Sequence, residues 1–461
     1  MTADLLSSIP KDVLSLCREL RTRGKRGWIV GGCVRDLLLG KSPKDWDVAT
    51  DALPKEVKRI FPKVIDTGIA HGTVTVLMNH VPYEVTTLRG DGAYTDGRRP
   101  DSVQFVNDID ADLARRDFTI NAVAIDPVDG HIVDPFDGRK DMERRLVKAV
   151  GDPRERFFED GLRVLRAARF SATLEFEIEE DTLRAMGEGR SHATFRKVSA
   201  ERVRDEWMKS MLAKKPSVAF EVMRRTDLLG ITCPEMIESV GCEQNKYHAF
   251  DVWGHAMACL DACDPKPGLR MAALLHDIGK PRSRAFSDKT NDFTFYDHER
   301  IGAEMADPIL TRLKFSNDER AHIIGLVRHH LICYSDDWTD AAVRRWLRRV
   351  GPSLAEDLYR IGRADALGKG RDVTEDLAML GRLRERAEAL ILAGAALSTR
   401  DLAIRGNDLM KALEILPGPV IGKILERLLE VVTDDPAKNE RSALVEEARK
   451  VISEGAEAGS R

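Results

Sequence analysis

The chain has 461 residues and a mass of 51.5 kDa, a length typical of about two to four domains. Hydrophobic residues make up 43% and charged residues 32%, which is enough apolar material for cores beneath a well-solvated surface. The formal charge of −4, from 72 basic and 76 acidic residues, excludes a uniformly basic nucleic-acid coat but not a local basic face. No apolar run approaches the roughly 18 residues of a membrane span, and the N-terminus does not resemble a signal peptide. We therefore expect a cytoplasmic protein that does not enter a membrane.

The seven cysteines are scattered along the chain and include no CxxC pair. An odd number without paired spacing argues against a disulfide framework. The same spacing argues against a zinc ribbon, which needs closely paired thiolates.

The chain changes character after about residue 140. A helix is expected to open at Asp12, and short apolar runs bounded by Gly, Pro or Asp predict strands. These runs are 27–30, 45–49, 73–78, 83–88, 103–106 and 122–126. From about Met142 onward, apolar residues recur at the three- and four-residue spacing of helices. The sequence therefore predicts an α+β protein, with a mixed β-sheet head flanked by helices and an all-helical remainder.

Two acidic residues, Asp45 and Asp47, are separated by one position. On a strand over 45–49, both side chains would project from the same face. Adjacent carboxylates repel unless a cation lies between them, and Mg²⁺ favours such ligands together with substrate phosphates. Glu84, on another predicted strand, is placed to supply a third carboxylate. A surface turn is the alternative interpretation of the acid pair.

Gly31 and Gly32 follow a predicted strand and precede a predicted helix over 34–39. Backbone N–H groups exposed at such a turn can bind a phosphate, although two glycines alone indicate no more than a tight turn. With the acid pair close behind them, the two glycines favour phosphate chemistry.

These motifs resemble those of the class II tRNA nucleotidyltransferases (CCA-adding enzymes) and the bacterial poly(A) polymerases. The resemblance rests on GGxxRD at 31–36 with DxD at 45–47, RRDFTINA at 115–122, EDxxR at 159–163 and the segment 201–209. It implies that Asp45 and Asp47 hold catalytic Mg²⁺. The residues that it assigns to nucleotide binding are Gly31, Gly32, Arg35, Arg116, Asp117, Asn121, Asp160 and Arg163.

Asp160 and Arg163 are expected to lie one turn apart on a helix and to face one pocket. A carboxylate only accepts hydrogen bonds and a guanidinium only donates them. Cytosine and adenine both offer an amino donor beside a ring-nitrogen acceptor, whereas uracil and guanine present the reverse order. One Asp–Arg pair could thus select C and A without a template. By themselves the two residues fit a solvated ion pair equally well.

The resemblance implies that the tRNA 3′ hydroxyl attacks the α-phosphate of CTP or ATP, so that C, C and A are added by a two-metal mechanism. The polar loop 89–100 is the expected lever that reshapes the pocket as the RNA end grows. A poly(A) polymerase, or an enzyme that adds only C-C or only A, is the alternative within the family. A non-enzymatic RNA-binding scaffold is an alternative from a third class. The acid pair argues against it, because nothing structural requires two adjacent carboxylates.

A second group of residues points to another metal. His276-Asp277 ends the apolar run MAALLHDIGK, and His255 and Asp365 flank it in sequence. Imidazole with carboxylate suits Mn²⁺, Ni²⁺, Zn²⁺ or Fe. The order H…HD…D resembles HD-domain phosphohydrolases, and His298 and His329 could extend it to a two-metal site. For His298, His329 and His330, a metal ligand and an ordinary histidine are equally open interpretations. We interpret His248 and His322 as ordinary core or surface residues.

Four parts are predicted: a nucleotidyltransferase head over 1–140, a helical neck and body over 141–240, an HD domain over 241–370 and a helical tail over 371–461. The expected partners are the tRNA 3′ end, ATP and CTP, with RNA contacts from the body and the tail. The resemblance implies that the HD domain acts on RNA ends. An alternative from another class is a metal-dependent phosphohydrolase acting on RNA ends or nucleotides, with the head gripping RNA. The oligomeric state is not indicated.

Overall fold

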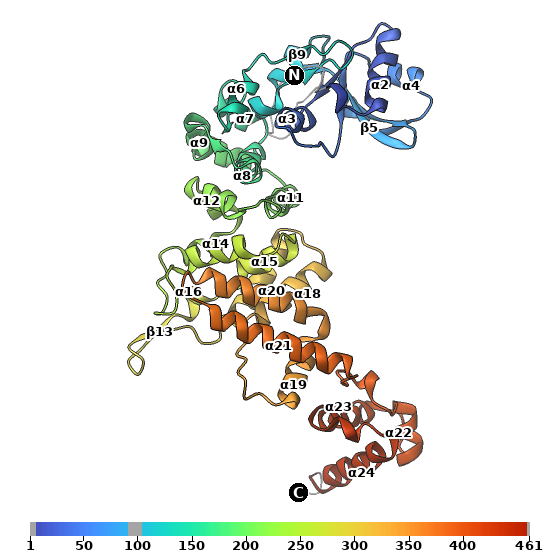
Figure 1. The fold of residues 1–461 in the computed structure, drawn as a ribbon, viewed down its shortest axis with the longest axis vertical. Helices are drawn as coiled ribbons and strands as arrows, with labels where there is room; N and C mark the ends of the chain where they lie inside the picture. The colour runs from blue at the N-terminus through green and yellow to red at the C-terminus, as the bar shows by residue number, and fades with distance from the viewer. Residues whose placement is uncertain (1–5, 91–103, 459–461) are drawn as a thin grey trace. The chain divides into compact units, whose positions relative to one another are not determined.

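The computed structural model describes residues 6–90 and 104–458 (Figure 1). The chain divides into two compact units, Met1–Ile237 and Glu238–Arg461. Within the described residues, no helix is both long enough and apolar enough to cross a membrane. The α+β class is confirmed, since strands gather in the first unit and helices make up most of the second.

A seven-stranded mixed sheet forms the head of the first unit. Its strand order is β3-β4-β5-β2-β1-β8-β9. Strands β2 and β5 run parallel, and the other neighbouring pairs are antiparallel. The strands are β1 (Gly27–Val30), β2 (Asp47–Thr50), β3 (Val64–Gly68), β4 (Thr73–Met78), β5 (Val81–Thr87), β8 (Ala124–Ile125) and β9 (Ile132–Val133).

The central strands are held by a core of small and large apolar side chains. Trp28 and Val30, two positions apart on β1, point to the same face and pack with Ala49 of β2. Leu88 and Leu113 complete this layer. Because β1 is buried along its whole length, its position was predictable from the apolar run alone.

Two predictions about strands need correction. Strand β2 begins at Asp47, so Asp45 lies in the bend before it and the two acids do not share a strand. The physical reason is the end of the partner strand: β1 stops at Val30, which pairs with Asp47, and leaves Asp45 without a neighbour. Strand β3 was missed because it is a largely exposed edge strand without a buried apolar pattern.

The expected lever loop lies mostly outside the described residues. A short two-stranded sheet, β6 (Arg89–Gly90) with β7 (Gln104–Phe105), joins its two ends. Residues 91–103 between them are not described, so the proposed role of the loop is untested.

Helices surround the sheet and continue after it through residue 237. Helix α2 packs on β1, and α8 packs on both α11 and α12. The helices and short 3-10 turns of this unit are α2 (Lys11–Thr22), α3 (Gly32–Leu38), α4 (Pro54–Ile60), η1 (Ile69–His71), α5 (Ile109–Ala114), η2 (Thr119–Asn121), α6 (Gly138–Glu143), α7 (Pro153–Glu159), α8 (Arg163–Leu174), α9 (Glu180–Met186), α10 (Gly189–Phe195), α11 (Ala200–Ser210), α12 (Ser217–Arg225), α13 (Leu228–Thr232) and η3 (Pro234–Ser239). A small parallel pair, β10 (Leu146–Val147) with β11 (Glu177–Ile178), was not predicted.

A break at Gly161 separates two helices that were predicted as one. Asp160 caps the end of α7 and Arg163 opens α8, so the expected one-turn spacing on a single helix is wrong. A Cβ atom on Gly161 would lie 2.7 Å from the backbone of Thr194 and Phe195. The close approach of α10 therefore fixes the break, and it sets how Asp160 and Arg163 are presented.

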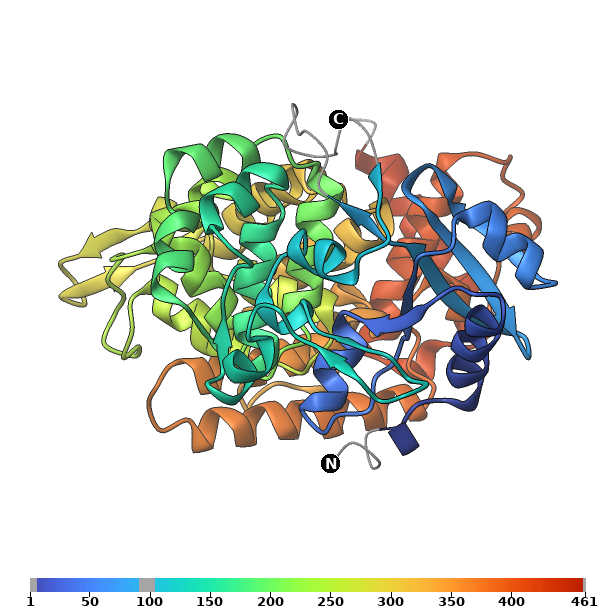
Figure 2. The same cartoon turned by 90° about the horizontal axis from the view of Figure 1, so that it is seen from above.

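The second unit is a helical assembly with one projecting hairpin, β12 (Ala285–Ser287) with β13 (Asp292–Thr294). The hairpin extends away from the helices of its own unit in both views (Figures 1 and 2). Helix α14 packs against α15 and α20, and α18 packs against α15, α17 and α20. The helices are α14 (Val252–Ala262), α15 (Pro267–Leu275), α16 (Lys280–Ser283), α17 (His298–Arg312), α18 (Asn317–His329), α19 (Asp340–Val350), α20 (Pro352–Gly368) and α21 (Thr374–Leu392).

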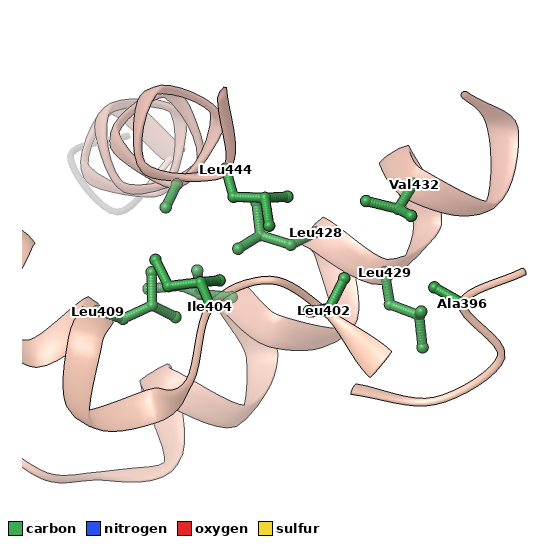
Figure 3. Close-up of a cluster of buried hydrophobic side chains, with 10 residues drawn as sticks. Ala396, Leu402, Ile404, Leu409, Leu428, Leu429, Val432 and Leu444 are labelled. Atoms are coloured by element: carbon green, nitrogen blue, oxygen red, sulfur yellow. The ribbon is translucent and has the colours of Figure 1, made fainter. Parts of the chain in front are cut away.

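The C-terminal helices share their own apolar cluster. Leu409 of α22, Leu428 of α23 and Leu444 of α24 meet in it, together with Ile404 from the preceding segment (Figure 3). These last elements are η4 (Thr399–Asp401), α22 (Gly406–Leu413), α23 (Pro419–Asp434), η5 (Pro436–Lys438) and α24 (Arg441–Ala458). As its Pro-Gly-Pro sequence predicts, α23 begins at a proline.

Replacing Gly161 by Ala should destabilise the first unit. The added methyl group meets backbone rather than a flexible side chain, so α10 must move, at a cost of about 1–3 kcal/mol. Gly189→Ala is the matched control, since nothing lies within 4 Å of its Cβ position. Urea denaturation of both variants checks this, and equal midpoints would contradict it.

Candidate active site and a second candidate metal centre

A pocket of about 510 Å³ lies in the first unit, where β2 and β5 of the head sheet meet α3 and the break between α7 and α8. All of the residues predicted for the head site line it except Asp45. They are Gly31, Gly32, Arg35, Asp47, Glu84, Arg116, Asp117, Asn121, Asp160 and Arg163. Asp45 is exposed in the bend before β2.

Two carboxylates face the pocket from neighbouring strands. Asp47 and Glu84 are paired in the register of β2 and β5, and because these strands are parallel their side chains lie on the same face. Burial and the negative charge of Glu84 raise the pKa of Asp47, against the opposing effect of Arg116. Asp45 raises it further. The three acids thus create a negative spot that a cation would neutralise.

The turn after β1 brings a cation beside these acids. Gly31 adopts φ +79°, which favours glycine, and α3 begins at the next residue. A Cβ on Gly31 would lie 3.0 Å from Nη1 of Arg116 and 3.8 Å from Oδ2 of Asp47. The absence of a side chain at this position lets Arg116 approach the acids.

A chain of hydrogen bonds fixes four residues along one wall of the pocket. Arg35 donates from Nη1 to Asn121 Oδ1 at 2.8 Å, and Asn121 donates from Nδ2 to Asp117 Oδ1 at 3.0 Å. Arg166 donates from Nε to Asp117 Oδ2 at 2.7 Å. These groups are therefore oriented before any ligand arrives.

Asp117 is the centre of that wall. Burial alone would raise the pKa of its carboxyl, but the charge of Arg166 and the hydrogen bond from Asn121 lower it to about 2. Asp117 is therefore ionised, and Arg166 forms an ion pair with it. Arg166 was not among the residues predicted for this site, and the structure places it in the pocket.

Asp112 holds two adjacent arginines at the pocket. It is buried in the first turn of α5, and its carboxylate accepts from Arg115 Nη2 at 2.5 Å and from Arg116 Nη2 at 3.0 Å. The i,i+3 and i,i+4 spacing was the available signal, but Asp112 stands outside the RRDFTINA motif and was missed.

The two residues expected to read the base both reach the pocket, and both have internal partners. Asp160 accepts from Arg202 Nη2 at 2.8 Å. Arg163 donates to Glu159 Oε2 at 2.6 Å and to the carbonyl oxygen of Arg115 at 2.7 Å. Arg202 was not singled out for this pocket because it lies on a later helix, α11.

The pocket as a whole suits a polyanion. Seven arginines and four carboxylates are among the lining residues, so its formal charge is positive. Most of these arginines are anchored by a carboxylate, which positions them without neutralising the wall completely. Its volume and charge are appropriate for a nucleoside triphosphate.

A second cluster lies in the other unit, where five elements bring titratable side chains together. His255 comes from α14, His276 and Asp277 follow α15, His298 opens α17 and Asp365 comes from α20. His330, at the end of α18, joins them. All of these side chains are buried except that of Asp365, which is 25% exposed.

The histidines of this cluster present their Nε2 atoms to one another. Nδ1 of His276, His298 and His330 lies 2.7 Å from the carbonyl oxygens of Ala273, Phe295 and Val327, respectively. A carbonyl only accepts, so each Nδ1 must donate, which leaves Nε2 free to bind a cation. Nε2 of His298 and His330 are only 3.3 Å apart, a separation that requires a proton or a metal between them.

Asp277 links two halves of the cluster. Its Oδ2 lies 3.3 Å from His255 Nε2 and 3.2 Å from His276 Nε2. Its Oδ1 lies 3.4 Å from His298 Nε2 and 3.6 Å from His330 Nε2. These residues would hold divalent metal ions, with the carboxylate of Asp277 between the two pairs of imidazoles.

In the metal-free cluster, histidine protons and one lysine balance the charges of the carboxylates. Burial would lower the pKa of His276, but the neighbouring carboxylate of Asp277 raises it well above the usual range. Burial would raise the pKa of Asp277, but His276 and Lys280 hold it well below its usual range. Lys280 Nζ lies 2.6 Å from Asp277 Oδ2. Protons and an ammonium group thus neutralise the acids.

Of the adjacent histidines His329 and His330, only His330 joins this cluster. His329 is only half-buried and does not belong to the two converging donor groups, whereas its neighbour His330 does. A helical turn separates the directions of adjacent side chains by about 100°, and the sequence HH alone does not choose between them. Cys259, also in the cluster, was not predicted as a ligand.

The two histidines that we interpreted as ordinary core or surface residues, His248 and His322, lie outside the donor groups. His248 packs edge to face on His255 and bonds Asn245. His322 pairs with Asp357.

Comparisons with known proteins identify the family. The family model described as "Poly A polymerase head domain" matches residues 27–148, and "tRNA nucleotidyltransferase domain 2" matches 294–448. A third, "Probable RNA and SrmB-binding site of polymerase A", matches 175–239.

The chain is 34% identical to a CCA-adding enzyme of Pediococcus pentosaceus over 96% of this chain and 98% of that protein. It is 34% identical to one of Lactobacillus johnsonii over 94% of this chain and 95% of that protein. The solved structure of Bacillus stearothermophilus CCA-adding enzyme in complex with CTP has a TM-score of 0.73 and 27% identity, and the match covers 96% of this chain and 98% of that one.

The fold and the comparisons define a template-independent nucleotidyltransferase. More specifically, the chain belongs to the family of CCA-adding enzymes, and the resemblance found in its sequence is confirmed.

Acid titration should reveal the buried Asp117–Arg166 pair. The folded-state pKa of Asp117 is about 2, below the ordinary value of about 3.9, so its stabilising effect is full above pH 4 and is lost as the pH falls toward 2. Asp117→Asn should remove this pH dependence, which amounts to about 2 kcal/mol. Unfolding free energies of both proteins between pH 2 and 5 check it. Parallel curves for the two proteins would contradict it.

Proposed function

We propose that this protein adds C, C and A, from CTP and ATP, to the 3′ end of tRNA without a nucleic-acid template. The observation that carries the proposal is that one pocket holds the carboxylates of Asp47 and Glu84, an arginine-lined wall and the Asp160–Arg163 pair. The membership in the family of CCA-adding enzymes names the reaction.

Mg²⁺ is the proposed cofactor, held by Asp45, Asp47 and Glu84. The donor set fits, because Asp47 and Glu84 lie in register on adjacent strands, and burial together with the charges of Glu84 and Asp45 raises the pKa of Asp47. Bound there, a pair of Mg²⁺ ions would activate the RNA hydroxyl and stabilise the leaving pyrophosphate.

The arginine wall is proposed to bind the triphosphate. Arg116 lies beside both Gly31 and Asp47, where it can pair with phosphate oxygens without losing its hydrogen bond to Asp112. Arg35, with Gly31 and Gly32, would bind the same group. Asp117 and Asn121 are held by Arg166 and Arg35, so their remaining hydrogen-bonding capacity would orient the sugar.

Asp160 and Arg163 are proposed to read the base. Their present partners, Arg202 and Glu159, occupy the same hydrogen-bonding groups that a base would use. A cytosine or adenine amino group would replace Arg202 at Asp160, and the ring nitrogen would accept from Arg163. Uracil and guanine would place an acceptor against the carboxylate and leave both partners unsatisfied.

We propose that the RNA is held by the parts outside the head. The four predicted parts, with bounds at 140, 240 and 370, remain the working division of the chain. On this division the body over 141–240 and the tail over 371–461 would contact the tRNA, and the HD domain over 241–370 would carry the second centre.

Asp47→Asn should abolish nucleotide incorporation. Loss of one carboxylate removes several kcal/mol of transition-state stabilisation, so labelled CTP incorporation into tRNA should fall roughly 100-fold or more. The matched control is Asp66→Asn, an exposed acid on strand β3 of the same sheet, which should keep full activity. Undiminished incorporation by Asp47→Asn would refute the assigned role.

Asp160→Ala should relax base selection rather than stop the chemistry. The variant loses a charged acceptor worth about 1.5–3 kcal/mol, so the preference for CTP over UTP should shrink roughly 10- to 100-fold. The ratio of kcat/KM values for the two nucleotides measures this. Asp205→Ala, which removes an exposed acid on α11, should leave the ratio unchanged. A variant that keeps its full preference would exclude base reading by Asp160.

A second candidate activity is metal-dependent hydrolysis of phosphate esters at RNA ends by the HD-like cluster. The observation that favours it is the convergence of the Nε2 atoms on Asp277. A divalent ion such as Ni²⁺, Mn²⁺, Zn²⁺ or Fe is the proposed cofactor there.

Asp277→Asn should eliminate this hydrolysis and leave nucleotide addition intact, because the two sites lie in different units. Phosphate release from RNA ending in a 2′- or 3′-phosphate, with added Ni²⁺ or Mn²⁺, measures the first activity. Asp288→Asn, at an exposed position in the hairpin turn, is the control. Absence of any release by the unmodified protein would remove this candidate.

A further inference from the structure

Cys259 lies among the metal-binding groups of the second centre and has no place in the functions described so far. It follows His255 by one helical turn on α14, so both side chains leave the helix on the same face. Its Sγ lies 3.4 Å from His255 Nε2. Ligand atoms of Cys259, His255, His276 and Asp365 all lie within 4.8 Å of one another.

The helix crossing fixes the direction of this thiol. Cys259 is 1% exposed, and its Sγ lies 4.0 Å from the carbonyl oxygen of Asp365 on α20. One turn later on α20, a Cβ atom on Gly368 would come within 2.3 Å of the same sulfur. Glycine at this position therefore lets α20 approach Cys259 closely, which carries Asp365 to the same point as the sulfur.

We propose that Cys259 is a thiolate ligand of one metal ion of the second centre, together with His255, His276 and Asp365. This inference rests on the metal centre proposed above, and it concerns the identity of the ligands. Two imidazoles, one carboxylate and one thiolate match the coordination number and ligand types of a tetrahedral Zn²⁺ site. On binding, the thiol proton is released to solvent as the metal–sulfur bond forms.

The thiolate would make the two metal positions unequal. The half that contains Cys259 has four protein ligands besides Asp277, which closes the coordination shell. The half at His298 and His330 has nitrogen and oxygen donors, and among the described residues no thiol belongs to the donor group of His276, Asp277 and His330. The first position would therefore select a thiophilic ion such as Zn²⁺ or Co²⁺, and the second would leave room for water or a phosphate ester.

Cobalt substitution tests the ligand directly. The full-length chain is stripped of metal, titrated with Co²⁺ and followed by absorption spectroscopy. A thiolate ligand gives an intense near-ultraviolet sulfur-to-cobalt charge-transfer band, and a tetrahedral site gives strong visible d–d bands. We expect both in the unmodified protein. Cys259→Ser should lose the charge-transfer band and bind Zn²⁺ roughly tenfold or more weakly.

Cys263→Ser is the matched control, a buried cysteine one turn further along the chain that lies outside the donor group. Its spectrum should equal that of the unmodified protein, and circular dichroism reports whether each variant folds. Strong d–d bands without a charge-transfer band, or a band that survives in Cys259→Ser, would overturn the thiolate while leaving the metal centre in place. Absence of tetrahedral d–d bands altogether would remove the centre itself, and the thiolate with it.

Discussion

The pairing of Asp47 with Glu84 across two parallel strands is the constraint on which the head depends. Two carboxylates in register on one face repel, and burial of Asp47 adds to the cost. The surrounding structure places positive charge beside these acids. Arg116 approaches them because Gly31 has no side chain, and further arginines line the pocket. Such an arrangement of acids and arginines would suit a divalent cation and a polyphosphate that bind together. A substrate that carries its own metal ions would complete it.

Several arginines of the pocket are positioned by neighbouring acids. Asp112 holds Arg115 and Arg116, and Glu159 holds Arg163. Arginines that are fixed beforehand lose little conformational freedom when a triphosphate binds. The pair proposed to read the base differs, because Asp160 and Arg163 would have to exchange their internal partners for a base. A correct base would replace the internal hydrogen bonds that Asp160 and Arg163 give up. A wrong base would leave these groups without partners, and this difference would select the base.

Much of the head was predictable from the sequence, since buried apolar runs mark β1 and β4 and short motifs mark the pocket. What the sequence could not provide were relations between distant segments. The end of β1 decides that Asp45 stands outside β2, and α10 decides the break at Gly161. In the second unit, helix phase selects His330 over His329, and close approach of α20 brings in Cys259. Each depends on tertiary packing rather than on local pattern.

The central claim is ordered addition of C, C and A at one pocket. The most direct measurement supplies tRNA that ends before CCA, after one C or after both, with Mg²⁺ and labelled CTP or ATP. The account predicts that each RNA is completed to CCA and that addition then stops after one A. An enzyme that adds only C-C, only A, or an unbounded A tail would contradict the account, as would a protein that incorporates neither nucleotide.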